Sequence, residues 1–188
     1  MRVLTVKNYD ITEYVTHIVR KMEADGYHPD AVIGILSGGV PIADIFAQQL
    51  GLNGGVALRI SVFRQTSKNK KRFLSRIIKL LPTKILDYLR ILEAKMTFRG
   101  HTRKRVFDVE LPVELEDTRY SKILIVDDAI DSGATMSEVL KQVSKEYPNI
   151  EIKTAVMTVT TDNPIVCPDY CMYKNSTLMR FPWSLDSK

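Results

Sequence analysis

The chain has 188 residues, 45% of them hydrophobic and 26% charged, with a mild net charge of +5, a balance that is typical of globular proteins and excludes a disordered or fibrous chain. This length lets one domain bury a core without disulfides, and the two cysteines, Cys167 and Cys171, have no neighbouring histidine with which to complete a four-ligand metal site. We expect a cytoplasmic protein in a reducing compartment, because the start lacks the apolar stretch of a secretory signal and no apolar run is long enough to span a membrane.

The amino-terminal third of the chain predicts helices and strands in alternation. Residues 12–26 predict a helix with one buried stripe, because apolar residues recur there every three or four positions. Residues 31–36 form a continuous apolar run, which is typical of a strand covered on both faces in a parallel sheet. The turn Ser37-Gly38-Gly39 then leads into a second helix over 41–50, and residues 56–62 predict the next strand.

Most of the positive charge lies between residues 59 and 105, which hold 15 Lys and Arg but only 2 acids, whereas the rest of the chain has 12 bases and 20 acids. This concentration of charge favours an anionic ligand or partner. We expect an exposed loop over 65–72 and two helices, 73–81 and 84–96, as a basic helical insertion at about 63–103. The two helices either pack on the core or a subunit interface, or present a basic amphipathic surface to RNA or anionic lipid.

The second half repeats the alternation. Residues 104–109 predict a short strand, 122–126 a β-branched strand, 127–133 a turn, 134–146 a helix and 153–159 a further strand. Strands that alternate with helices predict an α/β fold in which a mostly parallel, twisted sheet is flanked by helices. Ligands of such folds bind outside the carboxyl ends of the strands, where both glycine turns would lie.

The turn that follows the strand at 122–126 has the chemistry of a sugar phosphate site. Asp127 and Asp128 are adjacent carboxylates, which are costly to place together unless they bind hydroxyls, a hydrated metal ion or a developing positive charge. Residues 132–135 add consecutive backbone N–H groups, two hydroxyls and a helix N-terminus, which together favour a phosphate. Ribose 5-phosphate carries both features, and a simple helix cap in a solvated turn is the alternative.

Residues 123–135, with the sequence ILIVDDAIDSGAT, resemble the signature of type I phosphoribosyltransferases, in which a strand precedes two acids and a D-[ST]-G-x-T turn. Residues 35–43, ILSGGVPIA, resemble the pyrophosphate loop of that family, and the two motifs occur in the expected order. The resemblance implies the type I phosphoribosyltransferase fold in a single domain over 1–188. It also implies transfer of ribose 5-phosphate from phosphoribosyl pyrophosphate (PRPP) to a nitrogenous base, for which a purine is expected, with release of pyrophosphate.

The same resemblance assigns roles to individual residues. Asp127 and Asp128 would hold the ribose hydroxyls, Asp131 would act as general base beside the incoming base, and Mg²⁺ would bind mainly through PRPP and water near the two acids. The 5-phosphate would lie on Ser132, Gly133, Ala134 and Thr135, and the pyrophosphate on Ser37, Gly38, Gly39 and the amide of Val40. Arg59 would add a cation for pyrophosphate, or else is an exposed arginine at a strand end. The loop at 65–72 would close over the site or remain a solvated run of charge.

The carboxyl-terminal segments 167–170 (CPDY) and 181–183 (FPW) resemble those of xanthine-guanine and hypoxanthine-type enzymes. By that resemblance Trp183 would stack on the base with Ile130 on the other side, or else it seals the end of the sheet. The sequence departs from that group where such enzymes carry a lysine that reads the 6-oxo group, because residues 158–162 read TVTTD. The preferred base therefore stays open.

The expected partners are PRPP and a nucleobase-like acceptor, and we expect a homodimer. Nucleic acid is a less favoured partner, because a ligand with phosphate and pyrophosphate groups accounts for the bases between Arg59 and Arg72 more economically. The alternative function is a regulatory protein on the same fold, which senses PRPP or a nucleotide and binds nucleic acid through its basic insertion. Salt-dependent binding of RNA or DNA without PRPP-dependent turnover would identify it.

Overall fold

The structure is a computed structural model, which describes residues 1–64, 82, 85–92, 107–116, 120–174, 177–184 and 187. The predicted loop at 65–72 and the predicted helix at 73–81 lie outside the described residues. Of the predicted helix at 84–96, residues 85–92 are described, and they are helical. The first part of the predicted strand at 104–109 also lies outside the described residues.

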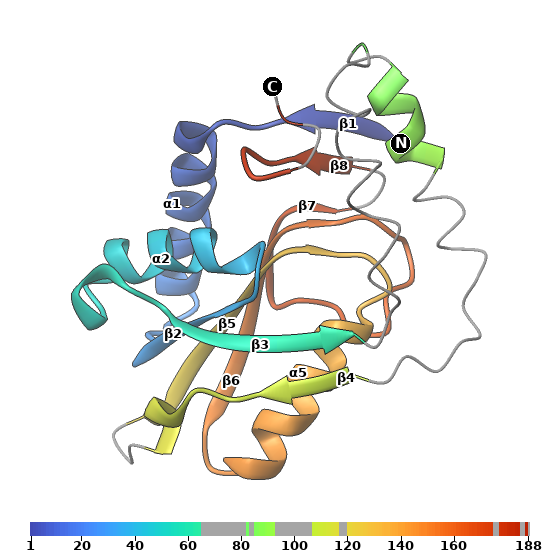
Figure 1. Ribbon diagram of the computed structural model, residues 1–188. Coiled ribbons are helices and arrows are strands. Elements are labelled where there is room, and N and C mark those ends of the chain that lie inside the picture. Colours follow the sequence, from blue (N-terminus) through green and yellow to red (C-terminus); the bar gives the residue numbers. More distant parts are fainter. Residues whose placement is uncertain are drawn as a thin grey trace.

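A six-stranded sheet forms the centre of the molecule (Figure 1). Its order is β4-β3-β2-β5-β6-β7, and every neighbouring pair is parallel except β3 and β4. The strands are β2 (Ala31–Ile35), β3 (Leu58–Arg64), β4 (Phe107–Glu110), β5 (Lys122–Ile130), β6 (Glu151–Val159) and β7 (Tyr170–Lys174). The prediction of an α/β fold with a mostly parallel sheet is thus confirmed.

Helices cover both faces of this sheet. Helices α1 (Asn8–Ala24) and α2 (Gly39–Gln49) lie on one face, and α5 (Ala134–Glu146) lies on the other (Figure 1). Helix α2 packs very close to β2, because a Cβ at Gly34 would lie only 2.7 Å from the Cα of Val40. Glycine at position 34 therefore permits this packing. Short 3₁₀ turns, η1 (Asn53–Gly55) and η3 (Val113–Glu116), lie in the connections.

A second, two-stranded sheet joins the two ends of the chain. Its strands β1 (Arg2–Thr5) and β8 (Thr177–Arg180) are parallel, with Thr5 opposite Arg180, and the sequence patterns did not predict them. The N–H of Val6 continues the pairing by donating a 3.0 Å hydrogen bond to the Arg180 carbonyl. The pairing determines where the residues after β8 lie, and these include Trp183.

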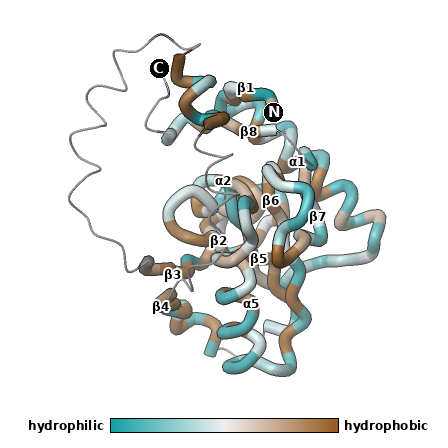
Figure 2. The backbone as a smooth tube through the Cα atoms, turned by 90° about the vertical axis from the view of Figure 1, so that its right-hand side faces the viewer, coloured by the Kyte–Doolittle hydropathy of each residue, from teal (hydrophilic) through white to brown (hydrophobic). Residues whose placement is uncertain are grey.

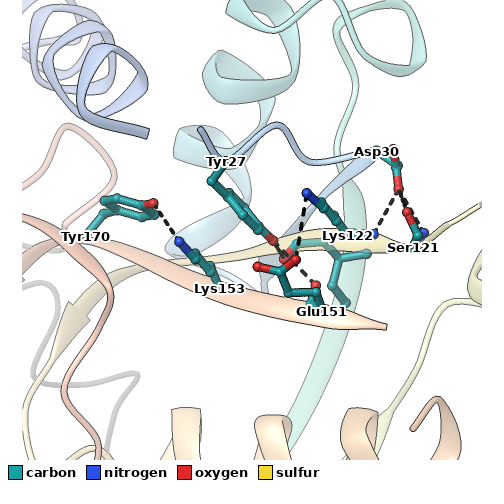
Figure 3. Close-up of polar contacts among 8 residues, drawn as sticks. Tyr27, Asp30, Ser121, Lys122, Glu151, Lys153 and Tyr170 are labelled. Carbon is teal, nitrogen blue, oxygen red and sulfur yellow. Dashed lines mark hydrogen bonds and ion pairs between the residues drawn. The ribbon is translucent and has the colours of Figure 1, made fainter. Parts of the chain in front are cut away.

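Polar side chains hold the amino ends of β5 and β6, at the edge opposite the glycine turns (Figure 3). The Tyr27 hydroxyl donates a 2.6 Å hydrogen bond to the Ile123 carbonyl, and Asp30 accepts bonds of 2.8 Å from the backbone N–H groups of Ser121 and Lys122. Burial raises the pKa of Tyr27, whereas the backbone N–H of Ser121 is the main cause that lowers the pKa of Asp30. These contacts join β5 to the end of the α1–β2 connection and so hold its register.

Several element boundaries differ from the prediction, among them those of β5 and α1. Strand β5 continues to Ile130, so Asp127 and Asp128 belong to the strand rather than to the turn. Helix α1 begins at Asn8 instead of Thr12, because Asp10 accepts a 2.7 Å hydrogen bond from the Lys7 N–H and caps the helix there. In the part of the chain that the structure describes, no helix combines the length and hydropathy needed to cross a membrane.

Candidate functional site

The glycine turn before α2 packs directly against the acidic end of β5. Strands β2 and β5 are neighbours, so the residues that follow β2 lie beside those that end β5. A side chain at Gly38 would overlap the carboxyl group of Asp128, with its Cβ 2.5 Å from Cγ. A side chain at Gly39 would lie 2.9 Å from the Cα of Asp127 and overlap the carbonyl oxygen of Val126. Glycine at both positions is therefore what lets the two motifs meet.

The two adjacent acids are partly exposed at this junction. The N–H of Asp128 donates a 2.9 Å hydrogen bond to Oδ1 of Asp127, which orients that carboxylate. Burial raises the pKa of Asp128; hydrogen-bonding contacts with Asp127, Trp183 and the Ala129 amide oppose the rise, and the charge of Asp131 adds to it. A carboxylate in such surroundings is stabilised by hydroxyl donors, such as those of a ribose ring, or by positive charge.

Trp183 approaches the same carboxyl group from the end of the chain. Its ring stacks on Phe181, with centroids 5.1 Å apart and planes 7° apart. The indole N–H is buried, and no group in the described residues accepts a hydrogen bond from it with normal geometry, although it lies near enough to Asp128 to lower the pKa of that acid. A buried indole N–H thus borders the site beside the Asp128 carboxyl group.

The second turn precedes α5 and is also set by a glycine. Gly133 has φ of +80°, a left-handed conformation that favours glycine, and a Cβ there would lie 2.9 Å from the N–H nitrogen of Val166. The Ser132 carbonyl accepts a 2.8 Å hydrogen bond from the Ile165 N–H, which anchors the turn to the loop after β6. Helix α5 begins at Ala134, as the sequence predicts.

Two helix N-termini therefore lie at the carboxyl edge of the sheet. Helix α2 begins at Gly39 after the turn at 36–38, in which a cis peptide bond joins Leu36 to the exposed Ser37, and α5 begins after Gly133. The first N–H groups of a helix lack partners within the helix, and the helix dipole makes this end positive. The edge thus has two helix N-termini, the kind of position that favours an anion, and that of α2 lies next to Asp127 and Asp128.

Asp131 is held by a residue that the sequence patterns did not assign. The Thr160 hydroxyl donates a 2.7 Å hydrogen bond to Oδ1 of Asp131. Thr160 is only 3% exposed, and its N–H donates a 2.9 Å bond to the Ile130 carbonyl, so its position is set by the sheet. The sequence signal that could have identified Thr160 is a hydroxyl residue directly after a buried strand. It lies within residues 158–162, where xanthine-guanine and hypoxanthine-type enzymes carry a lysine.

Two predicted site residues have surroundings that differ from the prediction. Arg59 was placed at a strand end, but β3 runs from Leu58 to Arg64, so Arg59 is its second residue; it lines a surface pocket of about 570 Å³ with Pro112 and Val113. Ile130 is 2% exposed and belongs to the core cluster beneath α5, whereas Trp183 packs against the cluster on the α1 and α2 face. The prediction that Ile130 and Trp183 enclose one base is therefore wrong, because the core already buries Ile130.

Comparisons with known proteins agree with the fold described above. The family model described as the phosphoribosyl transferase domain matches residues 7–174. No match was found among curated proteins.

Among solved structures, the chain is similar to a purine phosphoribosyltransferase from Pyrococcus horikoshii Ot3, at 21% identity and a TM-score of 0.64 over 98% of this chain and 95% of that one. It is also similar to the xanthine-guanine-hypoxanthine phosphoribosyltransferase of Helicobacter pylori, at 14% identity and a TM-score of 0.66 over 96% and 91% of the two chains. A hypothetical protein from Neisseria gonorrhoeae, solved with bound ppGpp, matches at 17% identity and a TM-score of 0.63 over 98% and 90%. At these identities the likeness shows the fold.

Proposed function

The chain belongs to the phosphoribosyltransferase family, and from this membership we propose that it transfers ribose 5-phosphate from PRPP to a nitrogenous base, with a purine as the expected acceptor. The observation that carries the proposal is the contact of the Gly38-Gly39 turn with Asp127 and Asp128, beside the N-terminus of α5. The names of two similar structures, both purine-type phosphoribosyltransferases, support a purine.

PRPP has three parts, and the junction offers a different chemistry for each. Asp127 and Asp128 would accept hydrogen bonds from the vicinal ribose hydroxyls. The 5-phosphate would lie on the turn at 132–135 and the positive end of α5. Pyrophosphate would lie on the turn at 37–39, where the amides at the start of α2 are available. The order of these parts along PRPP calls for two anion sites with acids between them, and the two helix N-termini and the acidic pair support this assignment.

The transfer breaks the bond between C1 of the ribose and pyrophosphate and forms a bond between C1 and a nitrogen of the base. The leaving pyrophosphate keeps the electron pair, and the ribose gains positive charge in the transition state. The carboxylates of Asp127 and Asp128 would stabilise that charge, since they are held in place before the reaction. Asp131, oriented by Thr160, would accept the proton that the base loses.

The acidic pair also fits a Mg²⁺ ion that is held mainly by its substrate. Two adjacent carboxylates offer oxygen ligands, and the described residues contain no cluster of three or more His, Cys, Asp or Glu that could hold a metal ion alone. Mg²⁺ commonly keeps several water ligands and binds through one or two carboxylates together with substrate phosphates. When bound, it would neutralise charge on the leaving pyrophosphate.

The experiment is to incubate the protein with PRPP, Mg²⁺ and a panel of purine and pyrimidine bases, and to measure pyrophosphate release and the nucleotide formed. We expect release with at least one purine. Asp131→Asn should lower kcat by about 10²-fold or more while PRPP still binds, and Asp128→Asn should weaken PRPP binding itself. Asp108→Asn, on the edge strand β4, is the matched control and should change neither.

Two results would contradict the proposal in different ways. PRPP binding without pyrophosphate release for any base would favour the regulatory alternative over the enzyme. Wild-type turnover in both Asp131→Asn and Asp128→Asn would show that transfer takes place elsewhere, so that the family assignment stands but the site does not.

A further inference from the structure

The helix at 85–92 has its apolar side facing solvent. Its exposed residues are all large and apolar: Ile85 is 45% exposed, Tyr88 67%, Leu89 42% and Leu92 41%. Their spacing of three and four residues places them in one stripe along the helix. Figure 2 shows this short helix beside β1 and β8, mostly in the brown of hydrophobic residues. We call these four residues the apolar stripe.

The polar residues of the same helix point inward, and their contacts hold the helix with its apolar side facing solvent. Asp87 accepts a 2.5 Å charge-assisted hydrogen bond from Arg180, whose side chain is 3% exposed. Arg90 donates a hydrogen bond to the Met179 carbonyl of β8, and Leu86 is 4% exposed. An isolated helix of this length is unstable in water, so these contacts with β8 determine its orientation. They leave the apolar stripe as the outer surface.

An exposed apolar stripe marks an interaction surface, and the charge of the chain indicates its partner. In the sequence, the helix lies within residues 59–105, where 15 bases accompany 2 acids. A symmetric dimer through the apolar stripe would bring two such segments together, because a two-fold interface uses the same patch on both subunits. An anionic lipid surface instead attracts Lys and Arg and accepts apolar side chains at the boundary between headgroups and acyl chains.

We propose that the apolar stripe of residues 85, 88, 89 and 92 docks this protein on the surface of an anionic lipid bilayer. The two leucines and Ile85 would enter the boundary between headgroups and acyl chains, and Tyr88 would lie at the level of the headgroups, where aromatic side chains with a polar end are favoured. The helix lies on β8, which leads to Trp183, so docking would occur on the side of the small sheet. The proposal does not depend on whether the junction at Asp127 and Asp128 transfers ribose 5-phosphate.

The test is co-sedimentation of the full chain with phosphatidylcholine vesicles that contain or lack phosphatidylserine. We expect binding only when phosphatidylserine is present, and weaker binding as salt is raised, because ions screen the attraction. Leu89→Gln combined with Leu92→Gln should lower the partition coefficient at least about tenfold, since two apolar side chains no longer enter the lipid. Val56→Gln combined with Val113→Gln removes exposed apolar side chains elsewhere and should leave binding unchanged.

Five outcomes would overturn the proposal. The first two are an absence of vesicle binding by the wild type, and equal vesicle binding by the Leu89→Gln/Leu92→Gln variant. The third is a dimer of the wild type that this variant converts to a monomer in sedimentation velocity, which would make the apolar stripe a subunit interface. The fourth is a variant that loses RNA binding but keeps vesicle binding, which would assign the stripe to RNA. The fifth is a large fall in the Tm of the variant, which would show that the chain itself covers the stripe.

Discussion

Gly38→Ala should impair PRPP binding while leaving most of the fold intact. The new methyl group would overlap the carboxyl group of Asp128, lying 2.5 Å from its Cγ. That group is the end of a rotatable side chain, so the variant can relieve the overlap by turning the carboxylate away. Gly39→Ala meets backbone instead, at Val126 and Asp127, and cannot be relieved in this way.

The magnitude follows from the bonds that Asp128 would lose. Hydrogen bonds to a charged group contribute about 2 kcal/mol each, so the loss of one ribose hydroxyl should raise the Kd for PRPP roughly 30-fold. Overpacking at Gly38 should cost about 1–2 kcal/mol of folding free energy. Gly39→Ala should cost more, about 3 kcal/mol, because a strand and a helix must separate.

The assay is calorimetric titration with PRPP and Mg²⁺, together with urea unfolding of each variant. Gly26→Ala is the control: Gly26 has φ of +68° and free space around it, so the substitution should cost about 1 kcal/mol of stability and leave PRPP affinity unchanged. A folded Gly38→Ala variant with wild-type PRPP affinity would refute the conclusion that this turn and Asp128 form one binding site.

Three further predictions concern other contacts. Thr160→Val should lower kcat about tenfold with little change in the KM for PRPP, because Asp131 loses the donor that orients it; steady-state kinetics measure this, and an equal rise in KM would contradict it. Asp87→Asn removes the carboxylate that accepts a hydrogen bond from the buried Arg180 and should lower Tm by roughly 2–4 °C in a thermal melt; an unchanged Tm would show that this ion pair does not stabilise the fold. Asp30 has a lowered pKa in the folded protein, so it stabilises the fold above its ordinary pKa of about 4 and that stability is lost as the pH falls further. The stability difference between wild type and Asp30→Asn in urea should therefore be largest at neutral pH and shrink in acid, and a constant difference would refute the assignment.

Much of the fold was predictable because its signals are local. The continuous apolar runs of β2 and β5 indicated strands buried on both faces, and the spacing in α5 gave that helix its correct bounds. Strands β1 and β8 escaped prediction because each is only four residues long and is stabilised by a partner at the other end of the chain. Their pairing depends on tertiary contacts, which a local pattern does not contain.

The candidate site divides in the same way. The sequence alone predicted a site at the two glycine turns with Asp127, Asp128 and Asp131, because consecutive residues in such motifs define their own backbone geometry and chemistry. Only the tertiary structure showed that Thr160 orients Asp131 and that Trp183 lies beside Asp128, since both contacts join residues about 30 or more positions apart.

Side-chain direction was likewise decided by packing. Alternation along β5 would place Ile130 on the face of Leu124 and Val126, but Ile130 lies in the cluster beneath α5. The helix at 85–92 has an ordinary amphipathic pattern, and from the sequence its apolar side was equally suited to packing inward on the core. The bonds of Asp87 and Arg90 to β8 orient the apolar side toward solvent. The spacing of apolar residues cannot predict this, because it shows which residues share a helix face but not what that face contacts.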